Sequence, residues 1–424
     1  MTYLKNWFQN NLKGKNGILF AVILCIITLP ISKLGLNNVA FGILILICIA
    51  NYKQLKFNRN NYLFIPIIYY ILLVLSCFWS IDIVQSISAL SKEITLILFP
   101  LIFLFLPKFS IDEKNKVLKV YSYSMAIYSL FLLLRAFIKF LEIKDINVFF
   151  YHELVTLEIN AIYISVIFAI GLLFLIRNNL KKWWDYTAAL LLFTVIILLS
   201  SKNVIVITTI LAGLSFVAFR RKIEFRNTFI LLGILALITF TFGNKIAERF
   251  EQEFKDFNEN VVLENGVVNV SLRNALYQED FDKNHYFSGS SFRLYQLRLL
   301  NEFIENDNIF WSGYGANAAQ GKIKDVQIKR NYQEYFGELN FHNQYAQSFA
   351  ELGFLGFVLF TAMIVFSISK AIIQKDYNFL VFIILAGSLS LTESLFSRQR
   401  GVVFFITFYC LYHHQLLKIK DENA

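Results

Sequence analysis

One histidine and the residues around it carry the clearest sign of chemistry in this chain. The stretch FHNQYAQSFAELGFLGFVLF, residues 341–360, sets His342 and Asn343 a few residues before a long apolar run. A neutral imidazole accepts a proton near physiological pH, which suits a general base. A histidine at the start of an apolar segment is, in isolation, more often a simple interfacial side chain. Asn343 either orients a substrate hydroxyl or caps the helix that follows it.

Basic residues upstream of this histidine are suited to holding a phosphate group. Arg293 follows Ser290 and Ser291, either of which can cap an amphipathic helix. We therefore expect Arg293 in the first turn of that helix, where free backbone N–H groups and a guanidinium together favour a phosphate. Arg298 lies five residues further on, about 140° around the helix. It is expected to contact solvent or acidic lipid instead.

Three ionisable side chains lie near the last two apolar runs. Glu393 falls in an otherwise apolar segment, where a carboxylate is costly and usually has a partner. It either pairs with Arg398 or Arg400 or hydrogen-bonds a substrate sugar. Each of these arginines either clamps a lipid diphosphate or anchors a helix at the headgroups.

The elements that position these residues are predicted to be transmembrane helices. Hydrophobic residues make up 57% of the 424 residues, and the mean hydropathy is +0.54. We count twelve apolar runs of about the length that crosses a bilayer. They occupy about 17–36, 38–52, 62–80, 94–107, 117–138, 160–177, 183–201, 204–219, 227–247, 353–373, 378–396 and 401–417. The sequence thus predicts an all-α, polytopic transmembrane helical bundle of about 12 spans.

Basic residues predict the orientation of the bundle. Lys and Arg number 21 in the loops on the side of the N-terminus, against 8 in the short loops on the other side. By the positive-inside rule, both termini are cytoplasmic. The net charge of +10 is therefore mainly a topology signal and does not indicate nucleic acid.

The predicted spans divide the chain into three parts. Residues 1–247 hold transmembrane helices 1–9, and residues 346–424 hold helices 10–12 and a cytoplasmic C-terminus. Between them, 248–345 form one large, partly helical periplasmic loop that carries the catalytic elements. Long loops of this kind in a compact bundle are usually functional. The middle of the loop has weak periodicity and is predicted to be a loop or a hairpin.

A glycine pattern follows the histidine. If a helix starts at His342, then Tyr345, Phe349, Gly353 and Gly356 fall on roughly one face. Two glycines on one stripe allow a neighbouring helix to approach closely. This predicts one continuous helix that holds the imidazole of His342 at its outer end, near the membrane surface.

The spacing of these residues resembles the signature of the O-antigen ligase family, integral-membrane enzymes that use polyprenyl-diphosphate sugars. The pattern is His342-Asn343, nine residues, then Gly353-Phe354-Leu355-Gly356. The upstream SFRLYQ…WSGYGANAAQ and the later LTESLFSRQRGVVFF, 391–405, are similar to patterns of the same family. One position differs: the family often has Ser-Arg after the seventh span, whereas this chain has Ser201-Lys202, which keeps the charge but not the guanidinium fork.

The resemblance implies a metal-independent inverting glycosyltransferase without a cofactor, acting on the periplasmic face of the inner membrane. Its donor would be a glycan on undecaprenyl diphosphate, and its acceptor a hydroxyl of lipid A–core or a similar molecule. His342 would be the general base. The residues that would bind diphosphate or sugar are Arg293, Arg400, Lys202, Asn343, Glu393 and Arg398. An Asp-x-Asp motif at 280–282 resembles metal-binding motifs of nucleotide-sugar transferases, but its predicted outer location favours a solvated acidic turn.

Three alternatives remain open. An O-antigen polymerase uses the same donor but tends to have Arg–ten residues–Gly motifs in two outer loops, and no arginine here has that spacing. A protein O-oligosaccharyltransferase shares the histidine signature and differs mainly in its acceptor. A polysaccharide flippase or transporter fits the number of spans, but candidate site groups here cluster at one end of the spans instead of mid-membrane.

Overall fold

The protein is mainly helical. The computed structural model describes residues 14–31, 35–156, 160–178, 180, 182–217, 260–262 and 266–414. The helices of the bundle are α2 (Gly14–Ile27), α3 (Gly35–Ala50), η1 (Tyr52–Gln54), α4 (Asn61–Ser76), α5 (Ile83–Glu93), α6 (Thr95–Phe105), α7 (Ile111–Ile143), η2 (Ile146–Phe149), α8 (Tyr151–Leu154), α9 (Ala161–Arg177), α10 (Trp183–Leu198), α11 (Lys202–Val217), α17 (Gln344–Ile373), α18 (Tyr377–Thr392), η4 (Leu395–Ser397) and α19 (Gln399–His413).

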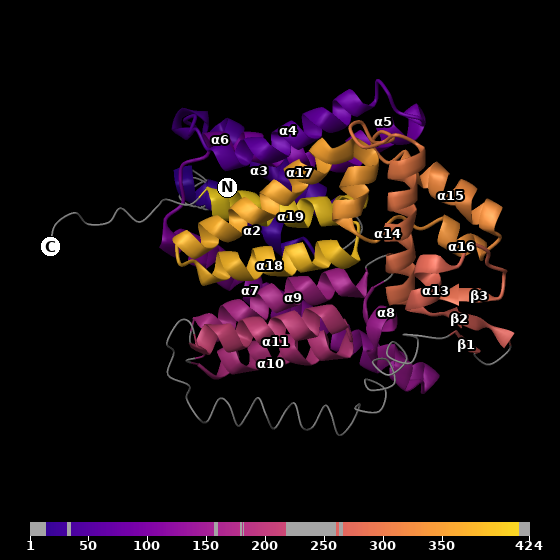
Figure 1. Ribbon diagram of the computed structural model, residues 1–424. Coiled ribbons are helices and arrows are strands. Elements are labelled where there is room, and N and C mark those ends of the chain that lie inside the picture. Colours follow the sequence, from indigo (N-terminus) through magenta and orange to yellow (C-terminus); the bar gives the residue numbers. More distant parts are fainter. Residues whose placement is uncertain are drawn as a thin grey trace.

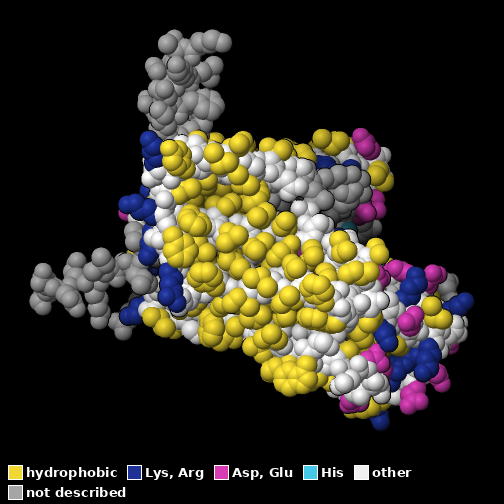
Figure 2. All heavy atoms as spheres, turned by 90° about the horizontal axis from the view of Figure 1, so that it is seen from above, with side chains coloured by type: hydrophobic (Ala, Val, Ile, Leu, Met, Phe, Trp, Pro, Cys, Tyr) yellow, Lys and Arg dark blue, Asp and Glu magenta, His cyan; other side chains and the backbone are white. Residues whose placement is uncertain are grey.

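These helices form a bundle with a lipid-compatible surface. Figure 1 shows the long helices lying side by side, and Figure 2 shows apolar side chains covering the face seen from above. Three helical stretches are long and apolar enough to cross a membrane: Ile83–Phe105, Ile111–Ile143 and Gln344–Ile373. Every predicted span except the ninth, 227–247, overlaps a helix, and the ninth lies outside the described residues. The chain is therefore a helical membrane protein, and the count of twelve spans stays a prediction.

A small domain lies at one end of the bundle (Figure 1), and we call it the end domain. Its elements are β1 (Val261–Val262), β2 (Val268–Val270), α13 (Leu272–Tyr277), β3 (His285–Phe287), α14 (Gly289–Asn306), α15 (Ala319–Arg330) and α16 (Glu334–Gly337). Strand β2 pairs antiparallel with β1 and parallel with β3. The hairpin predicted as one alternative for this region is thus present as β1 and β2. The end domain has its own core of aromatic side chains, separate from that of the bundle.

Helix α17 is bent where the sequence predicted one continuous helix. Asn343 caps it by accepting hydrogen bonds from the N–H groups of Tyr345 and Ala346, so His342 precedes the helix. Gly353 has φ 66° and ψ −162°, a conformation open essentially to glycine alone. A Cβ there would lie 2.4 Å from the backbone of Trp311. The prediction of an unbroken glycine stripe was therefore wrong, because Gly353 forms a kink.

The kink frees backbone carbonyls that another glycine-rich segment uses. The N–H of Tyr314 donates to the carbonyl of Ala350 (2.8 Å), and that of Gly315 donates to Glu351 (2.9 Å). A Cβ on Gly313 would lie 2.3 Å from the backbone of Glu351, so only glycine permits this approach. The GYGANAAQ segment thus fastens the end domain to the first part of α17.

Replacing the kink glycine should destabilise the protein. Gly353→Ala forces a Cβ into an unfavourable backbone conformation and against Trp311, and should lower the free energy of unfolding by about 1–3 kcal/mol or more. Thermal unfolding of purified protein in detergent measures the effect. Gly42→Ala in α3, where no atom lies within 4 Å of the new Cβ, is the control and should unfold at an unchanged or higher temperature. Equal melting temperatures for the two variants would contradict the role given to Gly353.

Candidate functional site

His342 lies where the end domain meets the bundle. Its backbone has φ 46°, unusual for a residue other than glycine, and its N–H donates to Asn340 Oδ1 (3.0 Å). The imidazole packs edge-on against Phe292 of α14, with ring centroids 5.7 Å apart. Its side chain is 23% exposed, so it is held by protein on one side and remains accessible.

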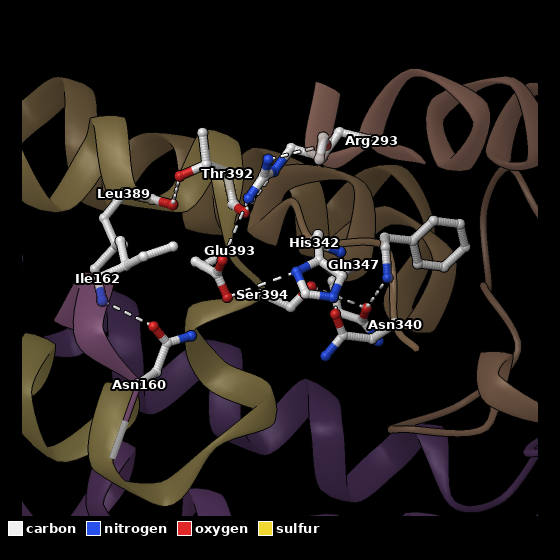
Figure 3. Close-up of polar contacts among 12 residues, drawn as sticks. Asn160, Ile162, Arg293, Asn340, His342, Gln347, Leu389, Thr392, Glu393 and Ser394 are labelled. Atoms are coloured by element: carbon white, nitrogen blue, oxygen red, sulfur yellow. Dashed lines mark hydrogen bonds and ion pairs between the residues drawn. The ribbon is translucent and has the colours of Figure 1, made fainter. Parts of the chain in front are cut away.

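Glu393 connects this histidine with an arginine from another segment. It follows α18 in extended conformation, and its side chain is only 6% exposed. One carboxylate oxygen, Oε2, lies 3.6 Å from His342 Nδ1, which is an electrostatic contact rather than a hydrogen bond. The other, Oε1, accepts a hydrogen bond from an Nη of Arg293 at 3.4 Å. Figure 3 shows the carboxylate with these two partners.

Arg293 reaches Glu393 from one turn inside α14. The helix begins at Gly289 after Ser288, whose backbone is extended, so the expectation of a cap at Ser290 or Ser291 was wrong. Arg293 consequently lies in the second turn, away from the free N–H groups of the helix start. Its Nε donates to the carbonyl of Thr392, and one Nη donates to that of Gly289, both at 2.9 Å. The guanidinium therefore ties α14 to the end of α18.

The structure brings together only some of the predicted site residues. Glu393 contacts His342 and forms an ion pair with Arg293. Of the two alternatives left open for this carboxylate, pairing with Arg398 or Arg400 is therefore not found among the described residues. Both partners approach Glu393 from the side of the end domain. Arg293 comes from α14, and His342 comes from the loop between α16 and α17. Nearness in the sequence did not identify the arginine partner of Glu393, because the fold brings Arg293 to it from 100 residues away.

The other predicted residues lie around this centre. Arg398 is exposed and Arg400 is half-buried, both at the start of α19. Lys202 is the first residue of α11. Its neighbour Asn203 exchanges two hydrogen bonds with Ser388, which lies in the last turns of α18, shortly before Glu393. Asn343 uses its side-chain oxygen as a helix cap.

Two residues outside the site were predicted with different success: the expected solvent or lipid contact of Arg298 was wrong, since its side chain is only 14% exposed, whereas the acidic turn at 280–282 is present. Arg298 donates to Glu302 (2.8 Å) and to the carbonyl of Gln278 (2.6 Å), so it faces the end domain instead of Arg293. Asp282, in the Asp-x-Asp motif, lies exposed in a turn before β3. A hydrogen bond from the backbone N–H of Asn284 lowers the pKa of its carboxyl.

A row of buried polar residues on α17 was not predicted from the sequence. Gln347 Oε1 accepts from the N–H of Phe341 and from Ser394 Oγ, both at 3.3 Å, and its Nε2 donates to Glu351 at 2.5 Å. Gln344 likewise accepts from the N–H of Phe396 at 2.6 Å. These glutamines join the loop before α17 to the loop after α18. Their signal was present as polar residues at helical spacing, three or four apart, in an otherwise apolar helix.

The carboxylate–imidazole contact can orient a base. A carboxylate beside Nδ1 favours a proton on that nitrogen and stabilises the imidazolium that forms when Nε2 accepts another. The nearby guanidinium supplies positive charge next to the imidazole. The centre therefore combines a proton acceptor with a group that attracts an anion.

Part of the chain is similar to a known protein family. No curated protein matches the chain. Residues 186–361 match the family described as O-antigen ligase, a range that includes both Arg293 and His342. That family comprises membrane glycosyltransferases of the ligase and polymerase type. The resemblance found in the sequence is thereby confirmed for residues 186–361, which are similar to the O-antigen ligase family.

Proposed function

We propose that this protein transfers a glycan from undecaprenyl diphosphate to a hydroxyl of lipid A–core or a similar acceptor, with inversion at the anomeric carbon. The contact of His342 with Glu393, beside Arg293, is the observation that carries the proposal. It sets a base and a cation at the same end of a membrane bundle. A family match over residues 186–361 supports transfer over transport.

His342 acts as the general base. Glu393 faces Nδ1, which leaves Nε2 to accept the proton of the attacking hydroxyl. The hydroxyl oxygen forms a bond to the anomeric carbon, while the bond from that carbon to the diphosphate oxygen breaks. The electron pair leaves with undecaprenyl diphosphate, and the proton remains on the imidazole until solvent removes it.

Arg293 binds the diphosphate and stabilises the charge that develops as it leaves. Three of its N–H groups already bond to protein acceptors, which fixes the direction of the guanidinium. Arg400, Arg398 and Lys202 add positive charge at the same end, and Asn343 has an amide nitrogen for a sugar hydroxyl. The diphosphate bond supplies the free energy of transfer, so no nucleotide is required. The proposed reaction is also metal-independent, so EDTA should leave transfer unchanged.

The site faces the periplasm of the inner membrane. The end domain lies at the right in Figure 1, and in Figure 2 Lys and Arg side chains gather along the opposite, left edge of the bundle. A basic end opposite the site supports a cytoplasmic location for that end. Donor and acceptor would then meet on the outer face of the inner membrane.

Orientation can be measured by cysteine labelling. Tyr277→Cys in the end domain, where the tyrosine is 75% exposed, should react with an impermeant maleimide in intact cells. Asn178→Cys, after α9 at the other end, should react only after permeabilisation. A reversed pattern would place the site in the cytoplasm and contradict the proposal.

The catalytic role of His342 predicts a loss of turnover. His342→Ala should lower kcat for transfer by about 10²–10⁴-fold, because no other group takes the proton. Donor binding should persist, since Arg293 holds the diphosphate. The measurement is transfer of undecaprenyl-diphosphate glycan to purified acceptor by reconstituted protein. Retention of most activity would make His342 an interfacial residue without a catalytic role.

The carboxylate can be tested in the same assay. Glu393→Gln keeps the shape of the side chain and should lower kcat less than His342→Ala, because Glu393 acts through the imidazole. The double variant should then lose little beyond His342→Ala alone, since residues of one unit are not additive. Losses that multiply would show that Glu393 acts apart from His342, through its hydrogen bond with Arg293.

Binding of the diphosphate by Arg293 can be tested against Arg298 of the same helix. Arg293→Ala should lower kcat/KM by about 10²–10³-fold, whereas Arg298→Ala removes contacts only within the end domain and should change it little. Arg293→Lys should recover part of the loss, because an ammonium cannot replace the fork. Size-exclusion profiles control for folding. Equal effects of the two alanine variants would refute the assignment.

The acceptor separates the proposed ligase from its closest alternatives. A lipopolysaccharide gel of a deletion strain should lose its ladder while undecaprenyl-linked polymer accumulates. Bands of a single repeat would instead indicate a polymerase, and loss of protein glycosylation would indicate an oligosaccharyltransferase.

A further inference from the structure

A second cationic site lies at the end of the bundle opposite the end domain. A cavity of about 530 Å³ opens there, lined by residues at the start of α4, after α6, and at the ends of α17 and α19. Its charged walls are Arg59, Lys108 and Lys370, and among the residues that the structure describes no Asp or Glu lines it. The remaining lining includes asparagine amides, two histidines and the apolar side chain of Ile373.

Lys370 is held in this cavity by neutral groups. Its ammonium lies 3.2 Å from His413 Nδ1 and 3.2 Å from the His413 carbonyl, and 4.7 Å from the centre of the Tyr62 ring. An ammonium only donates, so Nδ1 accepts and the proton of His413 is on Nε2. His413 Nε2 donates to Ser367 Oγ at 2.9 Å. The Ser367 hydroxyl in turn donates to the carbonyl of Met363 at 2.6 Å. The chain of bonds fixes Lys370 without cancelling its charge.

The cavity cations also lack the acidic partners that other basic residues have at this end. Lys114 pairs with Asp376, and Lys15 pairs with Glu113 at 2.6 Å. Across the part of the chain that the structure describes, Arg59, Lys108 and Lys370 form no salt bridge. Three cations around one hollow repel each other unless an anion joins them.

Polar groups in the cavity wall point to the same kind of ligand. Both terminal atoms of Gln374, Nε2 and Oε1, are buried without a hydrogen-bond partner in the described structure. Buried polar atoms are rarely left unsatisfied in native proteins. An oxygen-rich anion in the cavity would accept from the Gln374 amide as well as from the cations.

We propose that this cavity binds a phosphate ester, and that its three cations hold the phosphate oxygens. Ile373 lines the cavity and is 81% exposed, so the wall continues onto the apolar surface of the bundle. An acyl chain fits that surface, which favours the headgroup of an anionic phospholipid over a soluble phosphate. The proposal does not depend on the transfer reaction, because the cavity and the His342 site lie at opposite ends of the bundle.

Lipid binding to the purified, delipidated full-length protein tests this assignment. Native mass spectrometry with added phosphatidylglycerol should show a bound lipid that phosphatidylcholine does not replace. Arg59→Gln/Lys370→Gln should bind phosphatidylglycerol about 30-fold more weakly. Lys116→Gln, which removes an exposed cation of α7 outside the cavity, should bind like the wild type. Should the double variant fail to fold, Lys108→Gln removes an exposed wall cation and should still weaken binding.

A competition experiment distinguishes the two sources of phosphate. Inorganic diphosphate that displaces the lipid at low millimolar concentration would assign the cavity to a soluble phosphate ligand. Failure to compete, with lipid binding intact, would assign it to the headgroup. Equal binding of phosphatidylglycerol by wild type and every cavity variant, or equal binding of phosphatidylcholine, would overturn the proposal.

Discussion

The site depends on one buried carboxylate with two partners. Glu393 is 6% exposed and contacts His342 and Arg293, which come from separate segments of the end domain. A buried carboxylate without a partner is costly, so each of these contacts stabilises the folded arrangement. The same contacts join the end domain to the end of α18. The same two contacts of Glu393 therefore both dock the end domain and orient the imidazole of His342.

The bend in α17 makes this docking possible. A straight helix would use the carbonyls of Ala350 and Glu351 internally, and the GYGANAAQ segment would have no backbone partner there. Because Gly353 leaves the helical conformation, the segment bonds to these carbonyls and packs against the first part of α17. His342 lies directly before that part. The glycines therefore act on the site through the backbone, at a distance from the imidazole.

Helices were predictable from the sequence, but contacts across the fold were not. Long apolar runs indicate spans without reference to neighbours, so every described predicted span overlaps a helix. That Glu393 has a partner was also predictable, since membranes disfavour isolated charge. Its partner Arg293 is 100 residues away, and only the fold brings them together. The kink at Gly353 was missed because a glycine stripe has the same spacing whether the helix is straight or bent.

The structure also gives a physical reason for choosing one histidine over another. His413 uses both ring nitrogens, one facing Lys370 and the other Ser367, and it is 1% exposed. A ring held in this way has no free lone pair for a substrate proton. His342 has one nitrogen beside Glu393, and within the described residues its Nε2 makes no hydrogen bond. Accessibility and a free nitrogen therefore favour His342 over His413 as the proposed base, although both are imidazoles at the ends of membrane helices.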